Sequence, residues 1–409
     1  MKFFLTLGVA LVLLSCGEKK PVDRMNDEQL RVYADELVHK YIIVDGHVDL
    51  PDHLLEKKFS FALDTMNTLI STDNGDFDYE RAKKGGMDAP FMSIYIPASY
   101  QLLPDKGKGR ADSMINLVQD IVKNIPEKFA LAGSVEEIEK NFKDRKISLP
   151  MGMENAAPVG DDIKNVQYFY DRGIRYMTLT HGKDNQICDS STDTTRTWNG
   201  LSPYGREVVK EMNRVGIMVD ISHVADSTFY QVMELSKAPC IASHSSCKYF
   251  APDVKRDMTD DMIKKLGENN GVMMINFYTA FLSGEAYRQG KMIDSVLAAQ
   301  GLKSSNPLAK PLIEQFKKDH PAVVDVETVV NHIDHVVQLA SIDNVGLGSD
   351  FDGVGGAGNL PDGLKDVSQY PNLIYALLKR GYTESDIEKI CSGNVIRVWR
   401  KVAEVAKKG

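Results

Sequence analysis

Short apolar runs alternate with longer segments in which apolar residues recur at helical spacing along most of the chain. Eight of the short runs have the length and composition of buried strands: Ile42–Asp45, Phe91–Ile96, Ile147–Met153, Arg175–Thr180, Ile217–Ser222, Cys240–Ser243, Gly271–Asn276 and Val345–Ser349. The helical patterns between them include Tyr204–Val215 and Asp260–Asn269, and the acidic start of the latter favours the helix dipole. Eight strands separated by helices predict an α/β fold, a (β/α)8 barrel of the TIM type built as one domain.

Two segments exceed the minimal strand–helix unit. They run from Leu50 to Pro90 and from Tyr278 to about Val326, and we interpret both as insertions. Loops that follow the strands of such a barrel lie at its catalytic face, so the insertions are expected to wall or cover the site there. Contacts within a dimer are the alternative use, and the sequence leaves the role of the 279–326 insertion open.

The amino terminus predicts export. One positive charge, at Lys2, precedes an apolar run from Phe3 to Leu14. That run is too short for a hydrocarbon layer that needs roughly 20 residues, and it is typical of a signal peptide. Leu13-Leu14-Ser15-Cys16 resembles the lipobox of bacterial lipoproteins, so we expect Cys16 to become the lipidated first residue. Ordinary secretion, with Cys16 lost or unmodified, is the alternative.

This interpretation divides the chain into three parts. Residues 1–15 form the signal peptide, residues 16–30 a charged, solvated tether, and residues 31–409 the folded domain. The expected location is outside the cytoplasm, lipid-anchored to a bacterial membrane on the periplasmic side or at the cell surface.

Composition narrows the class of partner. The formal net charge is −8 and no basic cluster with interleaved aromatic residues occurs, which argues against a nucleic-acid surface and favours a small-molecule substrate. Cys188, Cys240, Cys247 and Cys391 are widely spaced without a CxxC pair. The sequence therefore indicates neither a disulfide framework nor a thiolate zinc site.

Ionisable residues gather where the predicted strands end. Four of the nine histidines occupy such positions. In a barrel these ends converge on one rim, where ligands and catalytic groups are built. The segments are Asp45-Gly46-His47-Val48-Asp49, Gly152-Met153-Glu154, Thr180-His181, Ser222-His223, Ser243-His244 and Ser349-Asp350-Phe351-Asp352.

Five of these residues form a candidate metal site. His47 and Asp49 stand at i and i+2, so both side chains point to the same side of a strand and can reach one ion. His223 and His244 add two nitrogen ligands, and the carboxylate of Glu154 can bridge two metals. Nitrogen and oxygen ligands without thiolate suit zinc, with manganese or cobalt as substitutes. Five ligands exceed the three of one catalytic zinc, so we predict two zinc ions per chain, roughly 3.5–4 Å apart.

The blocks VDGHVDLP, GME, LTLTH, NGLSPYGREVVKEMNRVGIMVDISH, IASHSS, KRDMTD and GLGSDFDGV resemble, in order, those of the membrane (renal) dipeptidases of the amidohydrolase superfamily. The resemblance covers residues 42 to 400. It implies that His47 and Asp49 hold one zinc, that His223 and His244 hold the other, and that Glu154 bridges them. It further implies that Asp350 transfers the proton, that His181 contacts the scissile carbonyl, and that Arg256 binds the substrate's carboxylate.

The expected reaction is hydrolysis of dipeptides by a metal-bridging hydroxide, because two zinc ions lower the pKa of a shared water to about 7. The resemblance also suggests tolerance of a D-residue at the C-terminal position and a homodimer. Two alternatives stay open: a related amidohydrolase that acts on N-acyl amino acids or β-lactams, and a lipoprotein that uses the barrel only to bind.

Several residues carry weaker expectations. Asn155 and the segment Pro90-Phe91-Met92 depart from the family pattern, and we expect them to line or adjoin the pocket and affect substrate preference. His332 and His335 lie at i and i+3 without an HExxH glutamate, so we interpret them as helix packing or capping. Asp352 is either an orienter of a zinc histidine or a turn residue.

Overall fold

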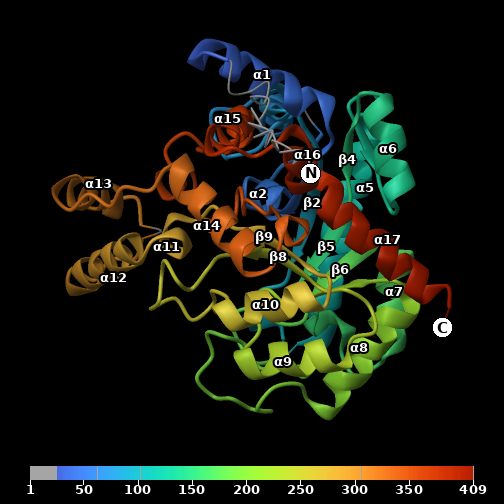
Figure 1. Ribbon diagram of the computed structural model, residues 1–409. Helices are drawn as coiled ribbons and strands as arrows, with labels where there is room; N and C mark the ends of the chain where they lie inside the picture. The colour runs from blue at the N-terminus through green and yellow to red at the C-terminus, as the bar shows by residue number, and fades with distance from the viewer. Residues whose placement is uncertain (1–24, 62, 102, 305, 409) are drawn as a thin grey trace, which may run out of the picture.

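The computed structural model describes residues 25–61, 63–101, 103–304 and 306–408. At its centre is a closed barrel of eight strands in the order β1-β10-β9-β8-β7-β6-β5-β2, with helices packed around it (Figure 1). Every strand pair of the barrel is parallel. The strands are β1 (Ile43–Val48), β2 (Met87–Tyr95), β5 (Met151–Glu154), β6 (Ile174–Thr178), β7 (Met218–Asp220), β8 (Ile241–Ser245), β9 (Val272–Ile275) and β10 (Val345–Leu347). The predicted TIM-type barrel is confirmed.

One of the predicted strands consists of two separate strands in the structure. The segment Ile147–Met153 divides at Pro150 into β4 (Ile147–Leu149) and β5, and β4 pairs with β3 (Phe129–Leu131) in a separate two-stranded sheet. Proline lacks the N–H that a continuing ladder would need. The carbonyl of Pro150 instead accepts a hydrogen bond from the N–H of Met92 in β2 at 2.8 Å, at the point where β5 enters the barrel.

The helices follow the predicted alternation. α8 (Pro203–Val215) begins after the N-cap Ser202 and ends before Gly216, whose φ of +93° suits glycine at a helix C-cap. The other helices outside the two insertions are α1 (Asp27–Lys40), α5 (Pro104–Asn124), α6 (Val135–Lys143), α7 (Lys164–Asp171), α9 (Asp226–Leu235), α10 (Asp260–Glu268), α14 (Val326–Leu339), α15 (Tyr370–Arg380), α16 (Glu384–Glu388) and α17 (Asn394–Ala406).

The ordered domain begins before residue 31. α1 starts at Asp27 with Asn26 as its N-cap, and a capping box between Asn26 and Gln29 fixes its first turn. Its buried face, which includes Leu30 and Leu37, belongs to the main apolar core. The predicted tether is therefore wrong in its last residues. The signal peptide and Cys16 lie outside the described residues. Within the described part of the chain, no helix is long and apolar enough to cross a membrane.

Both insertions follow strands of the barrel and are largely helical. The first holds α2 (Leu50–Glu56), α3 (Leu63–Ile70) and α4 (Tyr79–Gly85), and it ends before Met87, so Pro90 belongs to β2. The second holds α11 (Thr279–Leu282), α12 (Gly284–Ala299) and α13 (Ala309–Asp319). α12 and α13 project from the body as a hairpin (Figure 1) with an apolar cluster of their own around Ile293, Leu297 and Ala309.

Candidate metal centre

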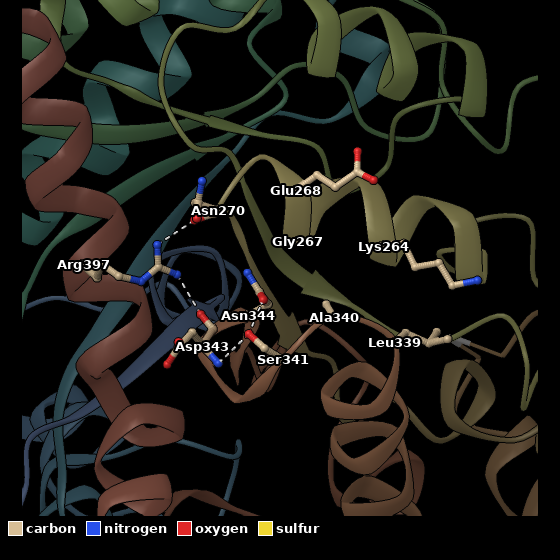
Figure 2. Close-up of a pocket in the computed structure, with 10 residues that line it drawn as sticks. All are labelled: Lys264, Gly267, Glu268, Asn270, Leu339, Ala340, Ser341, Asp343, Asn344 and Arg397. Atoms are coloured by element: carbon tan, nitrogen blue, oxygen red, sulfur yellow. Dashed lines mark hydrogen bonds between the residues drawn. The ribbon is translucent and has the colours of Figure 1, made fainter.

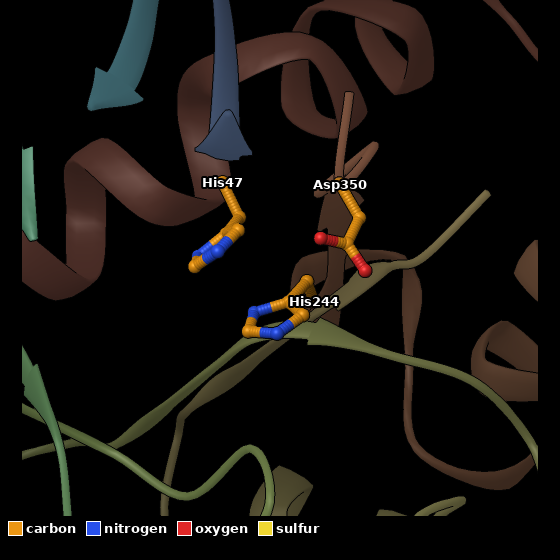
Figure 3. Close-up of side chains that lie close together, drawn as sticks. All are labelled: His47, His244 and Asp350. Carbon is orange, nitrogen blue, oxygen red and sulfur yellow. The ribbon is translucent and has the colours of Figure 1, made fainter. Parts of the chain in front are cut away.

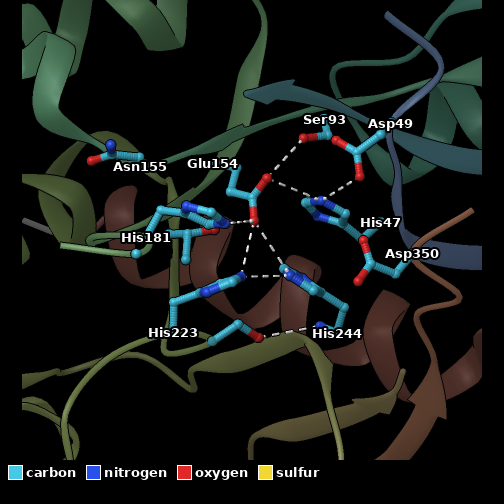
Figure 4. A network of polar contacts seen from close by, with 12 residues as sticks. His47, Asp49, Ser93, Glu154, Asn155, His181, His223, His244 and Asp350 are labelled. Carbon is cyan, nitrogen blue, oxygen red and sulfur yellow. Dashed lines mark hydrogen bonds and ion pairs between the residues drawn. The ribbon is translucent and has the colours of Figure 1, made fainter. Parts of the chain in front are cut away.

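Glu154, the last residue of β5, lies at the centre of the histidines that the sequence placed at strand ends (Figure 4). Its Oε1 lies 3.0 Å from Nε2 of His223, 3.4 Å from Nε2 of His244 and 3.6 Å from Nε2 of His181. Its Oε2 faces the other way and lies 3.4 Å from Nε2 of His47, which is 3.4 Å from Oδ2 of Asp49. The two carboxylate oxygens thus divide the cluster into two groups.

These spacings fit metal ions. Two donors that each lie about 2.0–2.2 Å from one tetrahedral ion are about 3.3–3.6 Å apart, and most of the distances around Glu154 fall in or near that range. Nε2 of His47 is buried and has no hydrogen-bond partner in the described part of the chain. A buried nitrogen without a partner is costly unless a ligand meets it. The donor set therefore suits ions bound on either side of the Glu154 carboxylate.

The tautomer of His244 is fixed by a chain of hydrogen bonds at its Nδ1 atom. Oγ of Ser243 donates a hydrogen bond to Oδ2 of Asp220 at 2.6 Å, so the N–H at Nδ1 of His244 donates to Oγ of Ser243, 2.7 Å away. This leaves the lone pair of Nε2 directed at Glu154, as a metal ligand requires. Asp220 itself accepts further bonds from the N–H groups of Ser222 and Ser243.

His47 is oriented by a tyrosine from a distant strand. The hydroxyl of Tyr176 in β6 lies 2.8 Å from Nδ1 of His47, which leaves Nε2 to face the cluster. The ring of Tyr176 reaches this position over Gly152, where a Cβ atom would lie only 2.0 Å from the ring. The glycine of the Gly-Met-Glu segment is therefore required for the contact that orients His47.

Sequence reasoning assigned no role to the two buried aspartates that support the site, although Asp45 was among the residues at the predicted strand ends. Asp220 accepts from the N–H of Ser222, and Asp45 accepts from the N–H of His47, each two residues further on. Asp45 also accepts from the N–H of Ser349, next to Asp350. The repeated Asp-x-Ser or Asp-x-His at a strand end was the available signal.

The electrostatics suit neutral imidazoles around an ionised carboxylate. Burial lowers the pKa of His223 and His244 well below the usual imidazole range, and the nearby Arg256 adds to this effect. Burial raises the pKa of Glu154, but His47, His181 and the hydrogen bonds from His223 and His244 outweigh it and hold the pKa well below its usual range. Neutral nitrogen and ionised oxygen are the forms that bind metal.

Asp350 lies beside His47 and His244 (Figure 3) and can join them around one ion or act next to it. Its N–H donates to the carbonyl of His47 at 3.0 Å, and its Oδ2 accepts from the amide of Asn276 at 2.8 Å. Burial raises its pKa to about 6; His47 opposes this effect, and Asp49 adds to it. Its φ is +66°, a left-handed conformation that is unusual for a non-glycine residue and common at functional sites.

Arg256 borders the cluster from the loop after β8. It is 6% exposed, and Nη2 lies 3.2 Å from Nε2 of His223. Nε and Nη1 have no hydrogen-bond partner, and no carboxylate of the described residues forms an ion pair with the guanidinium. Asp253 pairs with Arg288 instead. Arg256 is therefore not a surface arginine, and a buried guanidinium without an ion-pair partner is suited to bind an anion.

Two departures from the family pattern do not line the cluster. Asn155 is buried, and its amide donates to the carbonyl of Ile96 and to Oε1 of Gln101. Its φ of +74° is a left-handed conformation, which asparagine adopts more readily than most other residues besides glycine. Phe91 packs on Tyr176 and Trp399 in the core. The side chains of Asn155 and Phe91 therefore do not line the cluster, and the effect of these departures on substrate preference stays a prediction.

Three further residues are structural. His332 is buried between the N–H of Cys247 and the carbonyl of Leu282, and His335 meets Asp260, so both pack as expected. Asp352 contacts no histidine of the cluster in the structure; it bonds to Asp76. The four cysteines from Cys188 onward are buried, and none of them forms a disulfide in the described part of the chain.

A hollow of about 500 Å3 lies at the end of the barrel opposite to the cluster, and Figure 2 shows the residues that line it. Except for Arg397, which belongs to α17, its lining residues come from the segments that directly precede β9 and β10, whereas the cluster follows the strands. Arg397 there donates to the backbone carbonyls of Asn270 and Asp343. This end of a TIM-type barrel serves stability rather than catalysis.

Comparison with known proteins agrees with the geometry. The family described as membrane dipeptidase, peptidase family M19, matches residues 31–409. An uncharacterised dipeptidase of Schizosaccharomyces pombe is 32% identical over 374 residues, which span 89% of this chain and 81% of the relative.

Two solved structures share the fold. The probable dipeptidase PvdM of Pseudomonas aeruginosa superposes with a TM-score of 0.79 at 24% identity, over 93% of this chain and all of that one. A metallopeptidase of Rhodobacter sphaeroides, solved with a phosphinate mimic of the dipeptide L-Ala-D-Ala, has a TM-score of 0.72 at 24% identity, over 88% of this chain and 99% of the other. The chain belongs to the membrane dipeptidase family, peptidase family M19, and is a metal-dependent hydrolase.

Proposed function

We propose that this enzyme hydrolyses dipeptides with two zinc ions. His47 and Asp49 would hold one ion, His223 and His244 the other, and Glu154 would bridge them. The observation that carries the proposal is the division of the cluster by the two oxygens of Glu154, with His47 at Oε2 and the other histidines at Oε1. When bound, the ions supply a water that is ionised near neutral pH and polarise the substrate carbonyl.

The protein's own residues would complete the reaction. Asp350, held by Asn276, takes the proton of the attacking water and passes it to the departing nitrogen. His181 lies 3.6 Å from Oε1 of Glu154 with a side chain that is 27% exposed, so it can reach a substrate and stabilise negative charge on the carbonyl oxygen. Arg256 binds the terminal carboxylate, which fixes the distance to the scissile bond and restricts the enzyme to short peptides.

The resemblance to the family also supports tolerance of a D-residue at the C-terminal position. The metallopeptidase of Rhodobacter sphaeroides holds a mimic of such a dipeptide. The same resemblance supports a homodimer, which light scattering of the purified protein would test. Export and lipid attachment through Cys16 are supported by the amino-terminal sequence.

The decisive experiment combines metal analysis with a substrate panel. Purified protein is expected to contain close to two zinc ions per chain, to lose activity with a chelator and to regain it with zinc. L-Ala-L-Ala and L-Ala-D-Ala should be hydrolysed faster than N-acetylalanine or a β-lactam. A fully active metal-free preparation would contradict the zinc centre, and a preference for the N-acyl amino acid or the β-lactam would favour the related amidohydrolase activity instead.

A further inference from the structure

A large cavity adjoins the metal centre on the side of Arg256. Its volume is about 1330 Å3, and its walls are the loop that carries Arg256, the insertion helices α11 to α13 and the loop after β10. Pockets that hold drug-sized molecules measure roughly 300–1,000 Å3. The cavity therefore has room for a substrate side chain beyond the backbone of a dipeptide.

The charge of the lining is opposite to that of the protein. Two carboxylates, Asp294 and Glu314, face five cationic side chains, and the whole chain has a formal net charge of −8. The cationic side chains are Lys255, Arg256, Lys291, Lys310 and Lys317. Five positive and two negative side chains leave a net charge of about +3 on the lining, and none of the four lysines forms an ion pair with a described residue.

Lys317 is the most firmly held of these lysines. From α13 its Nζ donates to the carbonyl of Gly358 at 2.8 Å and to Oδ1 of Asn359 at 2.9 Å, in the loop after β10. Both acceptors are neutral, so its charge is not compensated. An ammonium has three donors, which leaves one for a ligand. A half-buried cation without a counterion is a natural place for an anion.

The orientation of a bound substrate places the substrate's C-terminal residue next to this cavity. In the proposed function, on which this inference rests, the scissile bond lies at Glu154 and the terminal carboxylate at Arg256. Arg256 touches His223 on one side and lines the cavity on the other. The C-terminal residue of the substrate therefore lies between Glu154 and Arg256, and its side chain is the part of the substrate nearest the cavity.

We propose that the cavity beneath the α12–α13 hairpin receives the side chain of the C-terminal residue and selects one that carries a second carboxylate. The preferred substrates are then dipeptides that end in glutamate or aspartate. Lys317, Lys310 and Lys291 determine this specificity by attraction at short range and are not catalytic residues. The aromatic side chains of Tyr278, Phe281 and Tyr287 in the same lining offer the competing outcome, a preference for an aromatic residue.

The test compares substrates of equal size and different charge. For Ala-Glu, the value of kcat/KM should exceed that for Ala-Gln by about five-fold to ten-fold at low ionic strength, and the ratio should fall toward one in 0.5 M salt, since salt screens partly exposed charges. L- and D-glutamate are both tested because the inference concerns charge and not stereochemistry. Equal rates for the charged and the neutral substrate, or a higher rate for Ala-Phe than for Ala-Glu, would overturn it.

Matched variants locate the effect. The double variant Lys291→Glu/Lys310→Glu should remove or invert the preference for Ala-Glu while hydrolysis of Ala-Ala continues. The control Lys303→Glu/Lys318→Glu changes the same number of charges on exposed positions of the same hairpin that do not line the cavity, and it should keep the wild-type ratio. Equal loss in both variants would overturn the assignment. Absence of any dipeptide hydrolysis by the wild type would instead contradict the proposed function itself.

Discussion

Asp76 and Asp352 exchange hydrogen bonds between backbone and side chain. The N–H of Asp76 donates to Oδ1 of Asp352 at 2.6 Å, and the N–H of Asp352 donates to Oδ2 of Asp76 at 3.0 Å. Gly75, at a φ of +86°, makes room for this pair, because a Cβ there would lie 2.8 Å from Oδ1 of Asp352. The pair joins the first insertion to the loop after β10, in which Asp350 stands two residues before Asp352.

Asp352→Ala is therefore expected to lower kcat more than it changes KM, because Asp350 is no longer held in place. It should also cost about 1–3 kcal/mol of folding free energy, since the N–H of Asp76 loses its acceptor. Asp352→Asn keeps an oxygen at this position and should restore most of both losses. Steady-state kinetics and urea denaturation measure the effects. An asparagine variant as poor as the alanine variant would argue that the charge, and not the hydrogen bond, matters.

Ser243→Ala tests the hydrogen bond between Nδ1 of His244 and Oγ of Ser243. Without Oγ, Nδ1 of His244 loses the acceptor that fixes its tautomer, so the affinity for metal should fall by about 10–100-fold. Competition with a chromophoric chelator measures the affinity directly. Ser245→Ala, on the same strand but bonded to Ser222, serves as the control and should bind metal nearly as the wild type does. An unchanged affinity in Ser243→Ala would remove the proposed role of the serine.

The sequence predicted the barrel and the convergence of the ionisable residues for one physical reason. Parallel strands of a closed barrel present all their carboxyl ends at one rim, so His47, Glu154 and His244, far apart in the chain, had to meet there. The groups that orient them could not be found in this way. Tyr176 reaches His47 only because Gly152 lies between them, and that contact depends on strand register and packing.

The prediction joined β4 and β5 into one strand, although Pro150 within the apolar run was a signal against an unbroken ladder. That the two strands enter different sheets depends on their hydrogen-bond partners, which the pattern of apolar residues does not show. The sequence left the role of the second insertion open. That Lys291, Lys310 and Lys317 line one cavity with Arg256 appears only in three dimensions.

Stability should depend on pH through His332. Burial lowers its pKa from 6.5 to about 4 in the folded protein. The unfolded chain therefore takes up the proton first as the pH falls, and the stability tied to neutral His332 is lost between pH 6.5 and 4, by about 3 kcal/mol at most. His332→Gln should flatten the pH dependence of the urea midpoint in this range, whereas the exposed control His320→Gln should not. Equal slopes in all three proteins would contradict this expectation.

Cys16→Ser should move the protein from the membrane fraction to the soluble fraction of exported proteins, because the lipid would have no attachment point. The domain, which begins near Asn26, should keep its fold and its dipeptidase activity. Fractionation followed by mass spectrometry of the amino-terminal peptide measures both. Unchanged fractionation with no lipid on Cys16 would remove the lipoprotein proposal and leave the enzyme assignment intact.

Arg256→Ala addresses how the enzyme measures substrate length. If the buried guanidinium binds the terminal carboxylate, kcat/KM for Ala-Ala should fall by about 2–5 kcal/mol in transition-state free energy, the scale for loss of one partner of a buried charge pair. Zinc content should stay intact, because Arg256 touches His223 without supplying a ligand.

A dipeptide amide is the control substrate for this variant, because it lacks the carboxylate that Arg256 would bind. Ala-Ala-NH2 should be a poor substrate for the wild type and should lose little more in Arg256→Ala. Asp350→Asn, by contrast, should depress kcat for both substrates, since it would remove the proposed proton carrier from both reactions. If Arg256→Ala discriminated between dipeptide and amide as strongly as the wild type does, the carboxylate site would lie elsewhere, and the buried guanidinium would then serve only to lower the pKa of His223 and His244 beside it.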